Sequence, residues 1–311
     1  MSSLDAGRNW LREHGSGAVV VPHHDADGLS AGALLARVTG GPALHVASPW
    51  DTPLPATGPA VIADWGVRPV AGPSPVLYVD HHAAPEQVDG TVVIPEADAL
   101  TSTSLLAWKL AGRPADGAWL AALGAFGDLG PEALRRRDVP SVGSSTALKK
   151  LSALVTAAGR VKDGPVAGAY DLLAASEDER AALLHPNRAE LDDAAGTVRG
   201  ARTRALRTPP EVGSDAAILR FAEPARVHPI VATAWAQRLA PRVVIAANDG
   251  WREDRVSFAV RSADGRDLRA WLLTRWSPPA GAGDYARGHR RATGGVLRPD
   301  AFENFAQAAL A

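Results

Sequence analysis

Length, composition and charge exclude several classes of protein at the outset. The chain has 311 residues, 46% hydrophobic and 22% charged, which suits two globular domains and not a disordered chain. It has no cysteine, so disulfides and thiolate-bound zinc are excluded and any metal must bind oxygen and imidazole groups. It has no run of eighteen apolar residues and no signal-like N-terminus, so we expect no membrane span and a cytoplasmic location.

The net charge of −1 conceals two unequal halves. Residues 1–185 carry 14 basic and 20 acidic side chains, whereas residues 186–311 carry 19 basic and 14 acidic ones. Carboxylates in one half could hold cations while arginines in the other hold an anionic substrate. Chance variation between two solvated surfaces explains the same counts about equally well.

Short apolar runs followed by acidic or histidine residues are the repeated pattern of the first half. The runs are Ala18–Val21, Ala60–Ala63 and Val76–Val79. Such runs are typical of buried parallel strands, and ligands of open parallel sheets bind beyond the carboxyl ends of the strands. We therefore predict an α/β fold, with a mostly parallel N-terminal sheet, flanking helices, and polar side chains gathered at one edge.

The remaining elements indicate a second, smaller α/β domain across a cleft. Residues 100–125 and much of 130–210 are predicted to be helical, and Thr208-Pro209-Pro210 marks a boundary. Further on, the pattern predicts three strands, with Asn248-Asp249-Gly250 and Ala263-Asp264-Gly265 as turns, and one helix. These strands and this helix are Ala216–Phe221, Val243–Ala247, Val256–Val260 and Pro229–Leu239. The predicted organisation is a metal-binding domain at 1–185, a linker at 186–210 and a substrate-binding domain at 211–311.

Asp and His side chains follow each predicted strand of the first half. The first group is His23-His24-Asp25-Ala26-Asp27-Gly28, ahead of a helix at Leu29–Val38, where Asp25 and Asp27 could also simply cap the helix. Asp64 follows the second strand and Asp80-His81-His82 the third, where a hydrogen-bonded turn is the alternative to a metal site. Asp128 ends a later helical stretch and alone would be an ordinary loop carboxylate.

Together these side chains predict a site for two divalent cations. So many carboxylates would repel one another without cations, and one bridging carboxylate could join two ions about 3.5–4 Å apart. Mixed His and Asp ligation favours Mn²⁺, with Mg²⁺, Fe²⁺ or Co²⁺ as substitutes. Such a centre would activate water for in-line attack on phosphorus.

The order His-X-Asp-X-Asp-Gly, Asp, Asp-His-His, Gly-Asp resembles the DHH phosphoesterase superfamily, which includes RecJ-type exonucleases, nanoRNases and cyclic-dinucleotide phosphodiesterases. The resemblance implies two metal ions that share Asp64. The implied ligands of the first ion are His23, Asp25 and Asp64. The implied ligands of the second are Asp27, Asp64, His81 and Asp128. As catalytic residues, His82 would face the scissile phosphate and Asp80 would support the histidines, whereas His24 has no clear counterpart.

The second half resembles the DHH-associated substrate-binding domain. Gly288-His289-Arg290-Arg291-Ala292-Thr293-Gly294-Gly295 is similar to its Gly-Gly-His-X-X-Ala-X-Gly signature, with Arg287 in place of the first glycine. A glycine-rich loop there would bring backbone N–H groups and His289 to a phosphate. Arg261-Ser262 resembles the Arg-Ser phosphate contact of that domain. The implied substrate-binding residues are Arg261, Ser262, Gly288, His289 and Gly294.

The resemblance implies a two-metal phosphodiesterase that degrades single-stranded DNA, RNA or short oligonucleotides to mononucleotides, as a monomer or a homodimer. A small-molecule phosphoesterase acting on cyclic dinucleotides, phosphoadenosine phosphate or polyphosphate is the alternative. An inactive binding subunit is a third reading, which the intact metal motifs oppose. Among the nine tryptophans, Trp251 and Trp276 are candidates for base stacking, although a core or interface position is the more frequent role.

Overall fold

The chain folds into two units, each with its own sheet and hydrophobic core. This computed structural model describes residues 2–46, 48–49, 52, 54–82, 87–95 and 101–311, with the side chain of His289 outside the description. The first unit comprises residues 1–159 and 164–195, and the second comprises 160–163 and 196–311. The boundary falls inside helix α8 (Arg188–Ala205), which occupies most of the segment predicted as a linker. No described helix combines the length and apolar character that a membrane crossing needs.

The first unit is built on a parallel sheet, as predicted. In the described residues the sheet has four strands in the order β1-β2-β3-β4, and all three strand pairs are parallel. The strands are β1 (Val19–Pro22), β2 (Ala60–Ala63), β3 (Val76–Val79) and β4 (Thr91–Val93). The last residues of the four strands lie opposite one another in register, so the carboxyl ends form one straight edge. The three predicted strands are confirmed within one residue, whereas β4 is additional.

Alternate residues of each strand enter two different cores. Val20, Val61 and Leu77 belong to the large core shared with the helices, while Ile62 and Tyr78 belong to a smaller cluster on the opposite face. Because both faces are covered, β2 and β3 are buried at every position. Continuous burial explains why these strands appear in the sequence as uninterrupted apolar runs.

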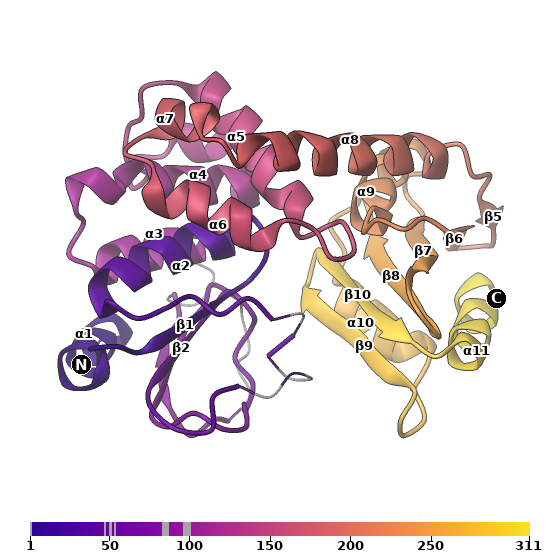
Figure 1. Cartoon of the computed structure of the whole chain (residues 1–311). Helices are drawn as coiled ribbons and strands as arrows, with labels where there is room; N and C mark the ends of the chain where they lie inside the picture. The colour runs from indigo at the N-terminus through magenta and orange to yellow at the C-terminus, as the bar shows by residue number, and fades with distance from the viewer. Residues whose placement is uncertain (1, 47, 50–51, 53, 83–86, 96–100) are drawn as a thin grey trace. The chain divides into compact units, whose positions relative to one another are not determined.

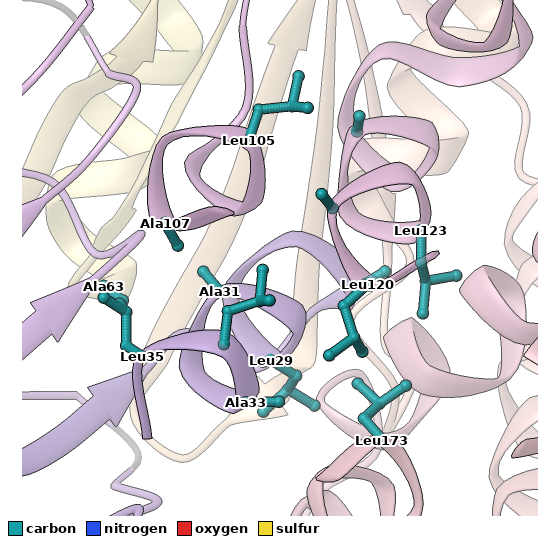
Figure 2. Packing of buried hydrophobic residues seen from close by; sticks show 14 of the residues in the cluster. Leu29, Ala31, Ala33, Leu35, Ala63, Leu105, Ala107, Leu120, Leu123 and Leu173 are labelled. Carbon is teal, nitrogen blue, oxygen red and sulfur yellow. The ribbon is translucent and has the colours of Figure 1, made fainter. Parts of the chain in front are cut away.

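The helices of the first unit pack mainly around α2, which follows β1 directly and contacts it (Figure 1). Leu29 and Leu35 of this helix lie among Leu105, Leu120 and Leu173 in the core (Figure 2). The α-helices are α1 (Ser3–His14), α2 (Ala26–Thr39), α3 (Thr103–Leu110), α4 (Ala118–Leu129), α5 (Ser145–Ala158), α6 (Val166–Ala175) and α7 (Glu179–Leu184). Two 3-10 turns are η1 (Ala115–Gly117) and η2 (Gly130–Arg135). The helical stretch predicted at 100–125 is therefore two helices, separated at Gly112, whose φ of 83° no regular helix contains.

The second unit contains a mixed sheet, with six strands in the described residues, in the order β5-β6-β7-β8-β10-β9. β6 and β7 are parallel and joined by α9, while the other pairs are antiparallel. The strands are β5 (Glu211–Val212), β6 (Ala216–Phe221), β7 (Val243–Arg252), β8 (Arg255–Arg261), β9 (Gly283–His289) and β10 (Ala292–Leu297). The helices are α9 (His228–Arg238), α10 (Leu268–Arg275) and α11 (Pro299–Leu310). The α/β class predicted for both domains is confirmed.

Two turn predictions in this unit need correction. Residues 248–250 continue β7 instead of turning, and the hairpin to β8 turns after Arg252. Asn248 is fully buried, and its side chain accepts N–H groups from Glu223 and Gly250, so it fastens a neighbouring segment to the strand. The glycine-rich stretch 288–295 is likewise not a loop but a β-hairpin of β9 and β10. Gly294 is required by close packing there, because a Cβ atom would lie 2.2 Å from the Phe258 carbonyl oxygen.

Candidate metal centre

The parallel ladder brings three strand ends together at one edge of the first unit's sheet. His23, Asp64 and Asp80 are the first residues after β1, β2 and β3. Each donates its backbone N–H to the last residue of the next strand, at 2.9, 3.1 and 3.0 Å respectively. Backbone hydrogen bonds thus hold these side chains at the sheet edge before any side-chain contact forms.

Asp25 both caps α2 and faces His23. One carboxylate oxygen accepts the N–H groups of Asp27 and Gly28 at 3.1 and 3.0 Å, and the other lies 3.0 Å from His23 Nδ1. Gly28 permits this turn, since a Cβ atom would lie 2.5 Å from the His23 carbonyl oxygen. The capping role and the metal-ligand role predicted for Asp25 are therefore compatible, because they use different oxygens.

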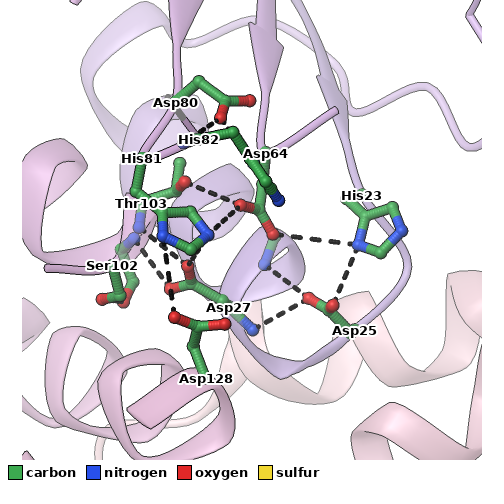
Figure 3. A network of polar contacts seen from close by, with 12 residues as sticks. His23, Asp25, Asp27, Asp64, Asp80, His81, His82, Ser102, Thr103 and Asp128 are labelled. Atoms are coloured by element: carbon green, nitrogen blue, oxygen red, sulfur yellow. Dashed lines mark hydrogen bonds and ion pairs between the residues drawn. The ribbon is translucent and has the colours of Figure 1, made fainter. Parts of the chain in front are cut away.

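Asp27 is buried in the first turn of α2 and holds the start of α3. Its two oxygens accept the backbone N–H groups of Thr103 and Ser104 at 2.7 and 2.9 Å. The Thr103 hydroxyl in turn donates to Asp64 Oδ1 at 2.7 Å (Figure 3). Thr103 and Ser104 are not among the site residues predicted from the sequence, although the run Thr101-Ser102-Thr103-Ser104 before an apolar segment is a recognisable helix-start signal.

Helix α4 approaches the site through two glycines. A Cβ atom on Gly124 would lie 2.2 Å from Ser104 Oγ and 2.6 Å from Asp27 Oδ1, and one on Gly127 would lie 2.8 Å from Ala26 Cβ. Only glycine lets the helix backbone come this near. The next residue, Asp128, consequently reaches the cluster.

Asp64 lies at the centre of the cluster and faces a histidine on each side. Its Oδ1 is 3.3 Å from His81 Nε2, and its Oδ2 is 3.8 Å from His23 Nδ1. His81 also approaches Asp128, with 3.6 Å between Nδ1 and Oδ2, and Asp27, with 4.0 Å between Nε2 and Oδ2. Asp64 adopts a φ of 68°, a left-handed conformation that costs a non-glycine residue about 1 kcal/mol and is frequent at functional sites.

Burial and crowding raise the pKa values of the central carboxylates. Burial, and then the neighbouring charge of Asp27, raise the pKa of Asp64 to about 7. Burial also raises the pKa of Asp128 to about 6 and that of Asp27 above its ordinary value. Burial alone would lower the pKa of His81, but its contacts with Asp64 and Asp128 outweigh that effect and raise it to about 10. The protein's own groups thus leave the cluster short of positive charge.

Asp80 orients His82 at the edge of the cluster. Asp80 is 1% exposed, and its Oδ1 accepts both the backbone N–H of His82, at 2.7 Å, and the ring Nδ1, at 2.6 Å. Its Oδ2 accepts the N–H of Gly66 at 2.6 Å. Burial raises the pKa of Asp80, but the bonds from His82 outweigh this effect and lower it. The ring of His82 is therefore fixed with its other nitrogen, Nε2, directed away from Asp80.

The donor atoms fit two divalent ions that share Asp64. Two groups of three each offer ligand atoms within 4.8 Å of one another, namely His23, Asp25 and Asp64, and Asp64, His81 and His82. Carboxylate and imidazole donors suit Mn²⁺ and its neighbours in the series. Asp27 and Asp128 are in neither group among the described residues, although both approach His81. The metal-ligand roles of all six predicted residues, and the catalytic roles of His82 and Asp80, stay predictions.

An aromatic side chain that the sequence analysis did not single out packs against the first histidine. The Trp65 ring meets His23 edge-to-face, with centroids 4.8 Å apart and planes at 89°. The same ring lies 5.6 Å from His24, and the ring of His45 lies 6.0 Å from His24. His24 thus belongs to a ring cluster beside the site.

The residues predicted to bind substrate lie in the second unit, each in a defined local setting. Arg261 ends β8 and donates from Nη1 to the carbonyls of Val260 and Thr293 at 2.8 and 3.3 Å. Ser262 Oγ donates to Asp264 Oδ1 at 2.6 Å. Gly288, with φ of 107°, pairs with Thr293 in the β9–β10 hairpin. The side chain of His289 lies outside the described residues, and the substrate contacts of this set stay predictions.

The tryptophans predicted as stacking candidates differ in their surroundings. Trp276 packs against Tyr285 and Phe305 of the second unit's core, with centroids 5.2 and 5.9 Å away. Trp251 is half-buried in β7. Trp276 therefore has the core role that the sequence analysis favoured.

Several solved structures share the fold of this chain over nearly its whole length. An exonuclease RecJ bound to manganese matches with a TM-score of 0.64 and 21% identity, over 100% of this chain and 94% of that one. The DHH domain of a member of the s1p family of ribosomal proteins matches with a TM-score of 0.61 and 14% identity, over 99% and 89%. PggH, a pGpG-specific phosphodiesterase from Vibrio cholerae, matches with a TM-score of 0.53 and 18% identity, over 94% and 97%.

The chain has the DHH phosphoesterase fold. A RecJ structure from Thermus thermophilus is longer, and the match covers 54% of that chain. No protein-family model matches the sequence, and no curated protein matches it. At sequence identities of 21%, 18% and 14%, this structural similarity establishes the DHH fold. The catalytic chemistry has to be argued from the side chains of the candidate metal centre.

Proposed function

We propose that this protein is a metal-dependent phosphodiesterase that hydrolyses single-stranded nucleic acid or short oligonucleotides to mononucleotides. The observation that carries the proposal is the position of Asp64, whose two oxygens face His81 and His23 on opposite sides. A carboxylate shared by two donor groups is what a two-ion centre for phosphoryl transfer needs. Its place at the carboxyl edge of a parallel sheet is where α/β proteins bind ligands.

The chain's own residues supply binding and orientation. In this proposal His23 and Asp25 hold one ion, while His81, Asp27 and Asp128 hold the other. His82, fixed by Asp80 through Nδ1, presents its ring to the scissile phosphate. Hydrolysis forms one P–O bond from water and breaks the ester P–O bond, and the leaving oxygen takes up a proton. Thr103 keeps Asp64 oriented through its hydroxyl.

When bound, two divalent ions supply charge stabilisation on the phosphate and acidify water. We propose Mn²⁺ as the preferred ion, with Mg²⁺ or Co²⁺ as substitutes, because the donors combine carboxylate and imidazole. The exonuclease RecJ structure that matches 100% of this chain is bound to manganese. A cytoplasmic location and a homodimer stay predictions from the sequence.

The substrate class is supported by what the structural neighbours act on. RecJ is named as an exonuclease and PggH as a pGpG-specific phosphodiesterase, and both share the DHH fold. A polymeric strand and a dinucleotide have the same phosphodiester linkage. A small-molecule phosphoesterase is thus the second candidate, favoured by the PggH likeness over 97% of that chain.

A substrate panel separates the two candidates. Purified protein with Mn²⁺ is incubated with labelled single-stranded DNA, short RNA, a cyclic dinucleotide, phosphoadenosine phosphate and pyrophosphate. Release of mononucleotides from the strands supports the proposal, and turnover of the cyclic dinucleotide or phosphoadenosine phosphate alone supports the second candidate. Absence of Mn²⁺-dependent hydrolysis of every substrate would reject both.

A further inference from the structure

Trp65 directly follows Asp64, and backbone hydrogen bonds hold the chain on both sides of it. Asp64 donates its N–H to the Val79 carbonyl at 3.1 Å, and Gly66 donates its N–H to Asp80 Oδ2 at 2.6 Å. Asp64 and Gly66 both adopt left-handed conformations, with φ of 68° and 83°. The three residues therefore form a fixed bend after β2, and the side chain of Trp65 is placed by the same bend that places Asp64.

The ring of Trp65 packs against the imidazole of His23. The two ring centroids lie 4.8 Å apart, and the ring planes meet at 89°. Strands β1 and β2 end in register, so His23 and the Asp64–Trp65 pair leave the sheet side by side. Perpendicular rings attract each other because the positive edge of one ring meets the negative face of the other. This contact opposes rotation of the His23 ring about its Cβ–Cγ bond.

The contact with Trp65 leaves the metal-facing nitrogen of His23 available. His23 Nδ1 lies 3.0 Å from Asp25 Oδ2 and 3.8 Å from Asp64 Oδ2. A ring nitrogen that binds an ion uses its lone pair, so it cannot also donate a proton to Asp25. Trp65 Nε1 is buried and has no hydrogen-bond partner among the described residues. Trp65 therefore contacts His23 through the rings, and this contact does not compete with an ion for Nδ1.

Further aromatic rings continue from Trp65 into the first unit. The Trp65 ring lies 5.6 Å from that of His24, with planes at 74°. The His24 and His45 ring centroids are 6.0 Å apart, and those of His45 and Tyr170 are 5.0 Å apart. Tyr170 belongs to α6. These contacts connect the ends of β1 and β2 to a helix, so Trp65 is supported by side chains from several elements.

Close packing also fixes the backbone of the two histidines. A Cβ atom on Gly28 would lie 2.6 Å from His23 Cβ, and one on Gly159 would lie 2.0 Å from the His24 carbonyl oxygen. Gly28 lies in α2, and Gly159 follows α5. Because helices hold this backbone in place, the remaining freedom of His23 is rotation of its side chain, which the Trp65 ring restricts.

Trp10 makes the same kind of contact at a place where no ligand is predicted. Its ring centroid lies 5.6 Å from that of His14, with planes at 64°. Its Nε1 is also buried without a hydrogen-bond partner among the described residues. Trp10 belongs to the hydrophobic core, whereas His14 is exposed at the end of α1. A comparison of Trp10 with Trp65 therefore separates packing from the orientation of a metal ligand.

We propose that Trp65 is a positioning residue of the candidate metal centre, which holds the His23 ring with Nδ1 toward Asp25 and Asp64. Its effect passes through His23 and concerns the first ion, while the donor group that contains His81 should be unaffected. This inference deepens the proposed function and rests on it for the presence of two ions.

The test is a calorimetric titration of the full chain with Mn²⁺, which does not require hydrolysis. We expect two binding events in the wild type, and His23→Gln should identify the event of the first ion by removing a ligand. Trp65→Leu should weaken that event roughly tenfold and leave the other unchanged. Trp65→Phe keeps an aromatic ring and should restore most of the affinity. In a His23→Gln background, Trp65→Leu should have no further effect on Mn²⁺ binding.

Trp10→Leu is the matched control. Trp10 is 5% exposed and Trp65 half-buried, so Trp10→Leu should lower the thermal midpoint at least as much as Trp65→Leu. Both Mn²⁺ binding events should nevertheless stay at the wild-type affinity. Circular dichroism should show that all variants are folded, because leucine still fills most of the apolar space.

Three results would overturn the positioning role. These are wild-type Mn²⁺ binding by Trp65→Leu, equal weakening by Trp10→Leu, and an effect of Trp65→Leu that persists in the His23→Gln background. A wild-type protein that binds no Mn²⁺ would overturn both this inference and the proposed function. Trp65-dependent Mn²⁺ binding without hydrolysis of any substrate would leave the positioning role standing and remove the proposed enzyme activity.

Discussion

Asp64 of the first unit and His228 of the second are both 5% exposed, but their surroundings have opposite charge. Asp64 lies among carboxylates that raise its pKa together with burial, whereas His228 lies among arginines that lower its pKa together with burial. In each unit, charged neighbours of one sign shift the pKa of a buried polar group. Groups with perturbed pKa values are frequent at functional sites, so each of these residues marks a candidate site.

The two units compensate their charges to different degrees. The first unit supplies His81, which contacts Asp64 and Asp128 directly. The hydrogen bonds of the Arg261 guanidinium to other described residues go to the uncharged backbone carbonyls of Val260 and Thr293. We therefore expect cations to bind the first unit and anions the second, and the following changes test that difference.

The largest effect should come from removing the shared carboxylate. Asp64→Asn is expected to lower turnover on the order of 10³-fold, about 4 kcal/mol of transition-state stabilisation. Calorimetric titration with Mn²⁺ should also show fewer bound ions, because the negative charge that both donor groups share is removed. The fold should persist, since the substitution removes a buried charge and retains the side-chain shape.

Asp89→Asn serves as its control, because this carboxylate is exposed between β3 and β4 and has no place in the cluster. It should bind and turn over as the wild type does. Wild-type Mn²⁺ stoichiometry and turnover in Asp64→Asn would show that the charge imbalance of the first unit has no catalytic meaning.

A second test uses two helix glycines with opposite surroundings. In Gly124→Ala the new Cβ would meet Ser104 and Asp27, so we expect a loss of about 1–3 kcal/mol of unfolding free energy and weaker Mn²⁺ binding. In Gly196→Ala, within α8, nothing described lies within 4 Å, and better helix propensity should stabilise the protein by up to about 1 kcal/mol. Thermal denaturation of both variants measures the difference, and equal midpoints would contradict the close approach of α4.

A smaller effect is expected from the hydroxyl that orients Asp64. Thr103→Val keeps the shape of the side chain but removes the hydrogen bond to Asp64 Oδ1, so Mn²⁺ affinity should fall roughly tenfold. Thr103→Ser keeps the hydroxyl and should restore most of that affinity. If the valine and serine variants bind Mn²⁺ equally well, Thr103 does not orient Asp64.

The smallest effect is expected at Asp215 in the second unit, a carboxylate that forms ion pairs with Arg266 and Arg275. Burial raises its pKa, but hydrogen bonds from Trp271 and Arg266 and the charge of Arg275 outweigh burial and lower it. A lowered folded-state pKa stabilises the protein above the unfolded pKa of about 3.9, and this stabilisation disappears as the pH falls through the folded value. Asp215→Asn should therefore cost about 1 kcal/mol near pH 7 and progressively less in acid. A constant difference in unfolding free energy across that range would show that the carboxylate charge is irrelevant there.

The strand ends of the first unit were predictable because their chemistry is local. A buried parallel strand needs apolar residues at every position, and Val76–Val79 followed by Asp80 displays both the strand and its polar end in sequence. The β9–β10 hairpin was not predicted, since Gly288 and Gly294 suggest a loop until their neighbours are known. Position 294 requires glycine because the backbone of Phe258 in the adjacent strand lies against it. No local sequence pattern reveals that contact.

The sequence alone determined which residue types could form the candidate metal centre. It also determined that these residues follow strands and precede helices. Tertiary structure decided that Asp64 faces His81 and His23, that Thr103 orients it, and that Gly124 admits α4. It also decided that the backbone of Arg160 lies beside that of Arg226, which no spacing in the sequence indicates. The physical reason is that strand and helix propensity act between near neighbours, whereas charge accumulation and close packing act between segments that only the folded chain brings together.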